Sequence, residues 1–147
     1  MQVPKLNFED TFDFKIRSDK DKFFIYDLVR KTWLILTPEE WVRQHWVHYF
    51  HFIKRRNRSS LILEKKLVLN GTTKRIDLLV TEKTHAKILV ECKAPNIKLT
   101  QQTFEQSARY NSVIGAEEII LSNGIHHIHG RFEDSQYKFQ EFNFNNI

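Results

Sequence analysis

Three charged residues in two otherwise apolar stretches of this 147-residue chain have types and a spacing that could do chemistry. Asp77 lies in RIDLLV, and Glu91 and Lys93 lie in ILVECKAP, two stretches that read as buried β-strands. Glu91 and Lys93 are two residues apart, so their side chains leave the same face of a strand. Burying such charges is costly unless they are paired or hold a metal ion.

A carboxylate on each of two neighbouring strands could form a cation site. If the strands pair, Asp77 and Glu91 project together at one end of a sheet, where their repulsion favours a proton or a bound cation. Oxygen ligands select a hard ion such as Mg²⁺. Lys93 on the same face could orient a water and stabilise developing negative charge, which is a way to hydrolyse a phosphodiester.

A purely structural explanation of these residues is simpler. Glu91 and Lys93 could form an ion pair on an edge strand, and Asp77 could pair with Arg75 or cap a turn. E-x-K is a common pattern and by itself does not indicate catalysis. The combination of two strand carboxylates, a lysine at the required offset and Pro95 just beyond them favours the catalytic interpretation.

The elements that must position these side chains follow from the apolar pattern. FDFKIRSDKDKFFIYDLVRKTWLIL contains β-rich runs broken by RSDKDK, which predicts an N-terminal antiparallel hairpin. TPEE predicts the start of a helix, with Thr37 as N-cap and Pro38 in the first turn, and KRRNRSS ends it. LILEKKLVL and KRIDLLV flank the turn signal NGTT and predict paired strands, and a further strand is expected over 88–93.

The remaining chain predicts a second helix and two more strands. Thr100 opens a helix that runs to about Ile114, EEIILSNG predicts a strand, and YKFQEFNF predicts a final one. This order fits an α/β (α+β) fold with a mixed central β-sheet flanked by helices. We expect one domain over residues 1–147, divided into an N-terminal β-hairpin extension (1–36), a core (37–130) and a C-terminal strand (131–147).

The composition is that of a folded domain, and its charge favours an anionic partner. Hydrophobic residues make up 41% and charged residues 28%, as in ordinary globular proteins, and the net charge of +5 favours a polyanion. The single cysteine, Cys92, excludes an internal disulfide and favours a reducing compartment. No apolar run is long enough to span a membrane. We therefore expect a cytoplasmic protein without a membrane partner.

The start of the first helix offers an accessory acid. On a helical wheel Glu39 lies near the stripe of Val42 and Trp46, whereas Glu40 points nearly opposite. Glu39 is therefore the better candidate for an accessory metal ligand. Stabilisation of the helix dipole is the alternative role for this side chain.

Two further groups of residues could support a site. Gln106 and Tyr110 are four residues apart and share a face of the second helix; a surface amide and a core tyrosine are the alternative. A basic cluster follows the first helix, where phosphate contact and a solvated helix end explain it equally well. The cluster consists of Lys54, Arg55, Arg56 and Arg58.

Together these residues resemble a known nuclease family. Asp77 followed by Glu91-Cys92-Lys93 is similar to the PD-(D/E)XK nuclease signature, with Ile76 where that family has a variable proline. TPEEWVRQ, KRIDLLV, ILVECKAP, FEQSARYN and LSNG extend the match across roughly residues 20–130. In this order they resemble the small proteins related to the N-terminal nuclease domain of type I restriction enzyme R subunits.

The resemblance implies a restriction-endonuclease-like core that cleaves DNA with Mg²⁺, or with Mn²⁺ in its place. By residue, it implies Asp77, Glu91 and the Cys92 carbonyl as metal ligands and Lys93 as the catalytic lysine. The second helix would supply a Q-x-x-x-Y element that packs beside the site and contacts DNA or this lysine.

The sequence also limits and qualifies this function. The chain contains no G-x-x-x-x-G-K-[ST] loop, so it cannot translocate DNA by itself as an ATP-driven R subunit does. A nuclease fold that binds nucleic acid or a partner protein without cutting is the alternative function. The sequence leaves open a homodimer or a partner protein, and endonuclease or exonuclease action.

Overall fold

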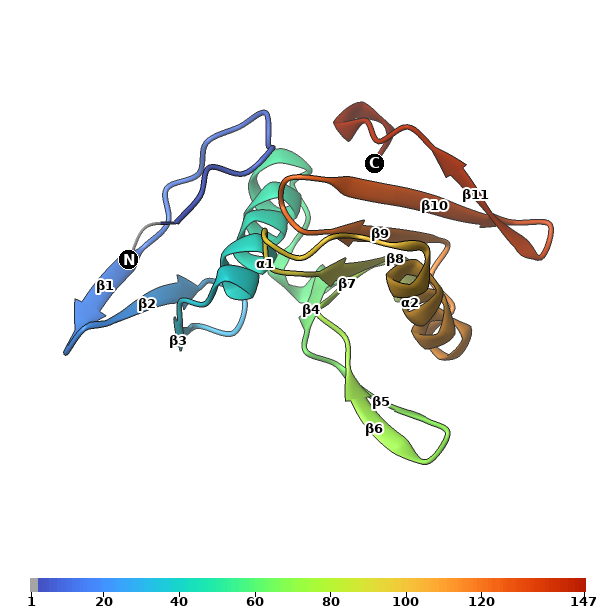
Figure 1. The fold of residues 1–147 in the computed structure, drawn as a ribbon, viewed down its shortest axis with the longest axis horizontal. Helices are drawn as coiled ribbons and strands as arrows, with labels where there is room; N and C mark the ends of the chain where they lie inside the picture. The colour runs from blue at the N-terminus through green and yellow to red at the C-terminus, as the bar shows by residue number, and fades with distance from the viewer. Residues whose placement is uncertain (1–2) are drawn as a thin grey trace.

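The centre of the molecule is a six-stranded mixed sheet (Figure 1) in the computed structural model, which describes residues 3–147. Its strand order is β11-β10-β9-β8-β7-β4. β8 and β9 run parallel, and the other neighbouring pairs are antiparallel. The strands are β4 (Leu61–Leu63), β7 (Leu78–Glu82), β8 (His85–Cys92), β9 (Glu118–Ser122), β10 (His127–Glu133) and β11 (Gln136–Gln140).

Two helices cover the two faces of this sheet, as Figure 1 shows. They are α1 (Pro38–His48) and α2 (Gln101–Ile114). Successive residues of β8 point to opposite faces: Val90 is buried in the cluster that contains Trp46 of α1, and Leu89 in the cluster that contains Phe104 of α2. The predicted fold class, a mixed sheet flanked by helices, is therefore confirmed.

Local sequence accounts for the ends of both helices. The Thr37 hydroxyl accepts a hydrogen bond from the Glu40 N–H at 3.0 Å, and Thr100 accepts one from the Thr103 N–H at 3.2 Å. Gly115, with φ of 76°, ends α2 in the left-handed region. The chain continues from α1 into one π-helical segment, Tyr49–Ile53.

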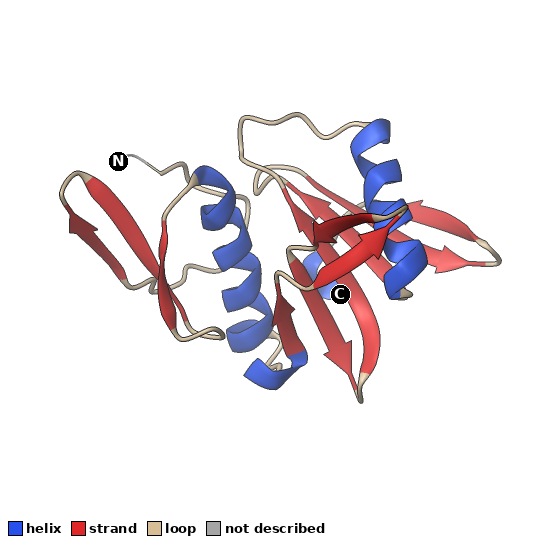
Figure 2. Cartoon of the chain, turned by 90° about the horizontal axis from the view of Figure 1, so that it is seen from below, coloured by secondary structure: helices blue, strands red, loops and turns tan. Residues whose placement is uncertain are grey.

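The N-terminal part of the chain forms a second, three-stranded antiparallel sheet. It consists of β1 (Ile16–Asp19), β2 (Lys22–Asp27) and β3 (Thr32–Ile35). The predicted hairpin is thus present and is extended by one strand. Figure 2 shows that α1 lies between this sheet and the central sheet, so that both sides of the helix are covered.

The strand runs on either side of NGTT are broken where one long hairpin was expected. β5 (Lys66–Leu69) and β6 (Thr72–Arg75) form a separate two-stranded hairpin, whereas β4 and β7 pair within the central sheet. Glu64, between β4 and β5, adopts a left-handed φ of 52°, which interrupts the extended chain. The break on the other side falls at Ile76 and Asp77.

The C-terminal segment also has more structure than one strand. β10 and β11 pair as an antiparallel hairpin at the edge of the central sheet, and the boundary expected at residue 130 lies within β10. Short 3₁₀ turns occur at Arg58–Ser60 and Phe144–Asn146. No helix in the described part of the chain is long and apolar enough to cross a bilayer.

Candidate active site

Pairing of β7 with β8 brings Asp77 and Glu91 together. Leu78 pairs with Val90, so Asp77, the residue before β7, lies opposite Glu91 at the end of the strand pair. The Cys92 N–H donates a hydrogen bond to Asp77 Oδ2 at 2.8 Å. Asp77 and Glu91 are only 8% and 6% exposed. The predicted neighbouring strands are confirmed, and both carboxyl groups are in a poorly solvated place.

Of the two acids, Glu91 has the surroundings that are less favourable for a negative charge. Its Oε1 atom is buried and has no hydrogen-bond partner among the described residues. Burial and then the negative charge of Asp77 raise the pKa of Glu91 well above its ordinary value, while the charge of Lys93 acts in the opposite direction. A proton or a cation between the two acids would remove this conflict.

Lys93 lies directly after β8 and is half-buried. Its backbone N–H donates to the Ser122 carbonyl at 2.8 Å, which continues the pairing with β9. Its positive charge lowers the pKa of both Glu91 and Glu39, so the ammonium lies within electrostatic range of both acids. Within residues 3–147, however, it makes no salt bridge with Glu91, and the simple ion-pair explanation is not supported.

Arg43 of α1 is the residue that sequence reasoning missed. Its Nη2 donates to Asp77 Oδ1 at 2.6 Å and its Nη1 to Glu40 Oε1 at 2.6 Å. Burial alone favours a neutral guanidine, but the carboxylates of Asp77 and Glu40 outweigh it and raise the pKa of Arg43, which is therefore charged. The suggested pairing of Asp77 with Arg75 is wrong. Asp77 pairs with Arg43, and Arg75 Nη1 lies 3.8 Å from Glu64 Oε2.

A local signal for Arg43 did exist on the helix. Arg43 follows Glu39 by four residues and Glu40 by three, and residues at these spacings lie on one helix surface. Glu40, which was expected to point nearly opposite the stripe of Val42 and Trp46, is nevertheless buried, since it is 6% exposed. The N-terminal sheet covers this second side of the helix, and Gln44 there donates to Asp27 of β2 at 2.9 Å.

Glu39 lies close to Asp77, as expected of an accessory acid. Its Oε1 accepts a hydrogen bond from Arg43 Nη2 at 3.3 Å, the same nitrogen that binds Asp77. Burial and then the charge of Asp77 raise the pKa of Glu39. The arrangement places it beside the candidate site, while its role as a metal ligand stays a prediction.

The remaining predicted site residues are the pair Gln106 and Tyr110 and the basic cluster after α1. Gln106 Nε2 donates to the Tyr110 hydroxyl at 3.1 Å, so these two residues bind each other; in the described chain neither is hydrogen-bonded to Lys93. The basic cluster follows the C-terminal end of α1, whereas Glu39 and Glu40 lie at its N-terminal end. Contacts of both groups with DNA stay predictions.

The donor atoms at this place fit a hard cation. They are carboxylate oxygens, and Glu91 Oε1 is buried without a hydrogen-bond partner among the described residues. Among residues 3–147, no three His, Cys, Asp or Glu side chains lie together as a ready-made metal site. An ion held here would therefore need further ligands from a backbone carbonyl, water or substrate.

Comparison with known proteins supports a restriction-enzyme relationship. The family described as "Type I restriction enzyme R protein N terminus (HSDR_N)" matches residues 38–144, from the start of α1 into the C-terminal 3₁₀ turn. No curated protein and no solved structure matches the chain. The match covers most of the chain and includes β7 and β8 with Asp77, Glu91 and Lys93. This chain belongs to the family of type I restriction enzyme R protein N-termini.

Proposed function

We propose that this protein is a Mg²⁺-dependent nuclease of the PD-(D/E)XK kind that hydrolyses phosphodiester bonds of DNA in the cytoplasm. One observation carries the proposal: two buried carboxyl groups face each other at the end of β7 and β8, and among residues 3–147 one of them has an unpartnered oxygen and the lysine that follows has no ion pair. A structural ion pair would have used this lysine. Membership of the restriction-enzyme family agrees with this interpretation.

The proposal assigns each residue a role. Asp77, Glu91 and the Cys92 carbonyl would hold Mg²⁺ or Mn²⁺, which when bound supplies charge neutralisation at the phosphate and acidifies a water ligand. Lys93 would donate hydrogen bonds to the attacking water and to the negative charge that develops on the phosphate. Arg43 would act as a positioning residue, since its guanidinium holds Asp77 in one orientation.

A second function is favoured by the same arginine. Arg43 already supplies a positive partner for Asp77, and a protein that uses this internal cation has less need of a metal ion. The alternative is therefore a nuclease fold that binds DNA, or a partner protein, without cutting it. The net charge of +5 would serve such a role as well.

A cleavage assay separates the two functions. Purified protein is incubated with linear, circular and single-stranded DNA in Mg²⁺, Mn²⁺ or EDTA. Cleavage that needs a divalent ion supports the nuclease, and the circular substrate distinguishes internal cuts from removal of nucleotides at ends. Binding of DNA without cleavage of any form under any ion would leave the binding function.

Metal binding is tested independently by thermal unfolding. Mg²⁺ or Mn²⁺ should raise the melting temperature of the wild type, because a ligand that binds the folded state stabilises it. Asp77→Asn should remove this gain, and the exposed control Glu105→Gln should keep it. An equal gain in Asp77→Asn and wild type would place the metal elsewhere.

A further inference from the structure

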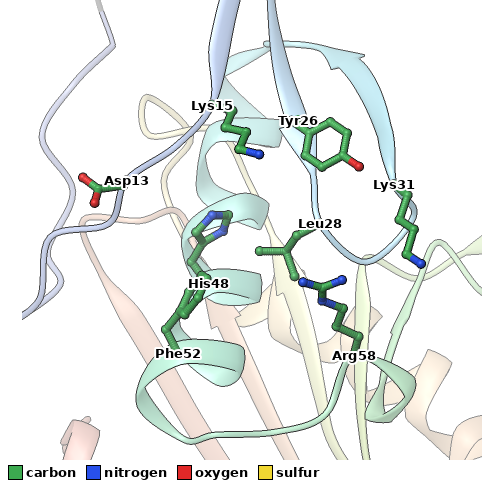
Figure 3. A pocket seen from close by; sticks show the side chains of 8 residues that line it. All are labelled: Asp13, Lys15, Tyr26, Leu28, Lys31, His48, Phe52 and Arg58. Atoms are coloured by element: carbon green, nitrogen blue, oxygen red, sulfur yellow. The ribbon is translucent and has the colours of Figure 1, made fainter.

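A pocket of about 310 Å³ lies at the other end of α1 from the carboxylates. It is bounded by the N-terminal segment, β2 and the following turn, the end of α1 with its π-helical continuation, and the 3₁₀ turn that begins at Arg58. Figure 3 shows the side chains that line it. They are Asp13, Lys15, Tyr26, Leu28, Lys31, His48, Phe52 and Arg58.

The pocket has an excess of positive charge. Lys15, Lys31 and Arg58 take part in no ion pair with another described residue, in contrast to Arg30 and Arg43 near the active site. The Asp13 carboxylate in Figure 3 points away from these cations. Three cations that line a hollow with one acid, whose carboxylate is turned away from them, are suited to an anionic ligand.

The remaining wall is aromatic and uncharged. Phe52 is 54% exposed, although it is a large apolar side chain, and its ring centroid lies 5.5 Å from that of His48. Burial lowers the pKa of His48 to about 4, although its Nδ1 lies 2.9 Å from the Gln44 carbonyl, a contact that acts in the opposite direction, and the ring is therefore neutral at pH 7. Lys15 Nζ lies 5.5 Å from the centroid of the Tyr26 ring. A flat ligand group could stack against the exposed ring of Phe52.

We propose that this pocket binds one nucleotide, with its phosphate among Lys15, Lys31 and Arg58 and its base against Phe52. A simple anion would use the three cations alone, whereas a nucleotide also explains the exposed phenyl ring. Base stacking on aromatic side chains is a common mode of single-strand recognition. The volume lies at the lower end of the range for small-molecule sites, which suits a mononucleotide-sized group.

The pocket is separate from the proposed cleavage site. His48 follows Glu40 by eight residues on α1, which places the two about 12 Å apart along a helix that rises about 1.5 Å per residue. No lining residue of the pocket belongs to the group formed by Asp77, Glu91 and Lys93. Nucleotide binding here therefore does not depend on metal or on cleavage.

The test uses calorimetric titration in EDTA on the full chain that carries Asp77→Asn, so that no strand is cut. The probes are thymidine monophosphate, thymidine, inorganic phosphate, and pentathymidylate with or without a terminal phosphate. Thymidine monophosphate should bind more tightly than thymidine, because the cations contact the phosphate. Arg58→Ala should weaken its binding about tenfold or more, whereas Arg109→Ala, an exposed arginine on α2, should leave it unchanged.

A second variant separates base from phosphate. Phe52→Ala should weaken the binding of thymidine monophosphate about tenfold and leave the binding of inorganic phosphate unchanged, since only the base stacks on the phenyl ring. Circular dichroism and thermal unfolding confirm that each variant is folded. Lys15→Ala serves as an independent variant if Arg58→Ala fails to fold.

The probes also identify the source of the nucleotide. Tighter binding of the monophosphate than of either oligonucleotide indicates a free nucleotide, and tighter binding of the phosphorylated oligonucleotide indicates a strand end. Both results support a nucleotide pocket. Equal affinities in Arg58→Ala and Arg109→Ala, or no binding of any probe by a folded protein, would overturn the proposal even if the wild type cleaves DNA.

Discussion

At Glu91, burial and the neighbouring Asp77 both oppose ionisation, and no described residue donates a hydrogen bond to Oε1. The metal-free folded protein therefore holds a proton on Glu91 more tightly than the unfolded chain does, whose glutamate has the ordinary pKa of 4.5. The sign of the pH effect follows from this difference. The unfolded state releases its proton first, so the free energy of unfolding falls as the pH rises above about 4.5.

Glu91→Gln should remove this dependence. In EDTA, the variant should gain stability over the wild type as the pH rises from about 4.5 to about 8, reaching about 1–3 kcal/mol, the cost of an unsatisfied buried group. Urea unfolding at several pH values measures it, and Mg²⁺ should reduce the difference by stabilising only the wild type. If the free energy of unfolding of the two proteins changed with pH in parallel, Glu91 would ionise in the folded protein without loss of stability.

Lys93 gives the sharpest distinction between an enzyme and a binding module. Lys93→Ala should lower the cleavage rate about 10²–10³-fold and leave DNA affinity and metal-dependent stabilisation nearly unchanged, because a cation is not a metal ligand. Single-turnover cleavage, DNA binding in Ca²⁺ and thermal unfolding measure the three quantities. The exposed lysine Lys98, changed to alanine, is the control. If activity fell only in proportion to the folded fraction, Lys93 would have a structural role.

Among the elements, α1 connects the N-terminal sheet to the candidate active site. Gln44 and Arg30 both donate to Asp27 at the end of β2, while Arg43 on the same helix holds Asp77 beside β7. The position of α1 on the central sheet thus affects the orientation of a proposed metal ligand. The turn between β9 and β10 packs directly against this helix at Gly124.

Gly124→Ala should disturb that packing. Gly124 has a φ of +85°, and a Cβ there would lie 2.8 Å from Leu6 Cδ2 and 3.1 Å from Val42 Cγ2. Both Leu6 and Val42 are buried. Gly71→Ala is a matched control, because Gly71 has a φ of +75° and open space around it. We expect a loss of about 1–2 kcal/mol for Gly71→Ala and about 1–3 kcal/mol more for Gly124→Ala in urea unfolding. Equal losses would mean that the neighbouring side chains move aside freely.

At the scale of the whole molecule, acidic residues and the basic cluster lie at opposite ends of α1. The acids Glu39 and Glu40 begin the helix beside Asp77, and the basic cluster follows its π-helical continuation. In this cluster, Arg56 Nη1 lies 3.8 Å from Glu82 Oε1, whereas Arg58 lines the proposed nucleotide pocket. DNA that contacted both ends would have to span the length of α1 over the elements that cover it, because most side chains of the helix are buried.

Salt dependence tests this path. Replacing the four residues of the basic cluster with alanine should weaken DNA binding and reduce the slope of log K against log salt by about 0.9 for each phosphate that the protein no longer neutralises. Electrophoretic or fluorescence titrations at several salt concentrations measure the slope. The control removes four dispersed exposed lysines, Lys5, Lys22, Lys83 and Lys138. The same slope in the cluster variant and wild type would leave the cluster as a solvated helix end.

Much of the fold could be read from local sequence. Thr37 and Thr100 cap helices through contacts with residues three positions away, so their signals lie within a few letters. Asn70-Gly71 predicted its turn, because both residues accept a positive φ. Lys83-Thr84 and Asp134-Ser135 make two-residue turns of the same left-handed kind without glycine, and their composition does not identify them.

Some features of the candidate site could likewise be predicted from local sequence, whereas others depend on how the elements pack. The alternation of side chains along a strand predicted from sequence alone that Glu91 and Lys93 share a face, and the apolar residues after Asp77 predicted the strand that begins directly after it as β7. The contact of Arg43 with Asp77 joins residues that are 34 positions apart, and it depends on how α1 is set against the central sheet. Burial of Glu40 likewise depends on the N-terminal sheet covering the second side of α1. Periodicity is a property of a single element, whereas burial, charge pairing and the shape of a pocket arise when separate elements pack, so these features appeared with the tertiary structure.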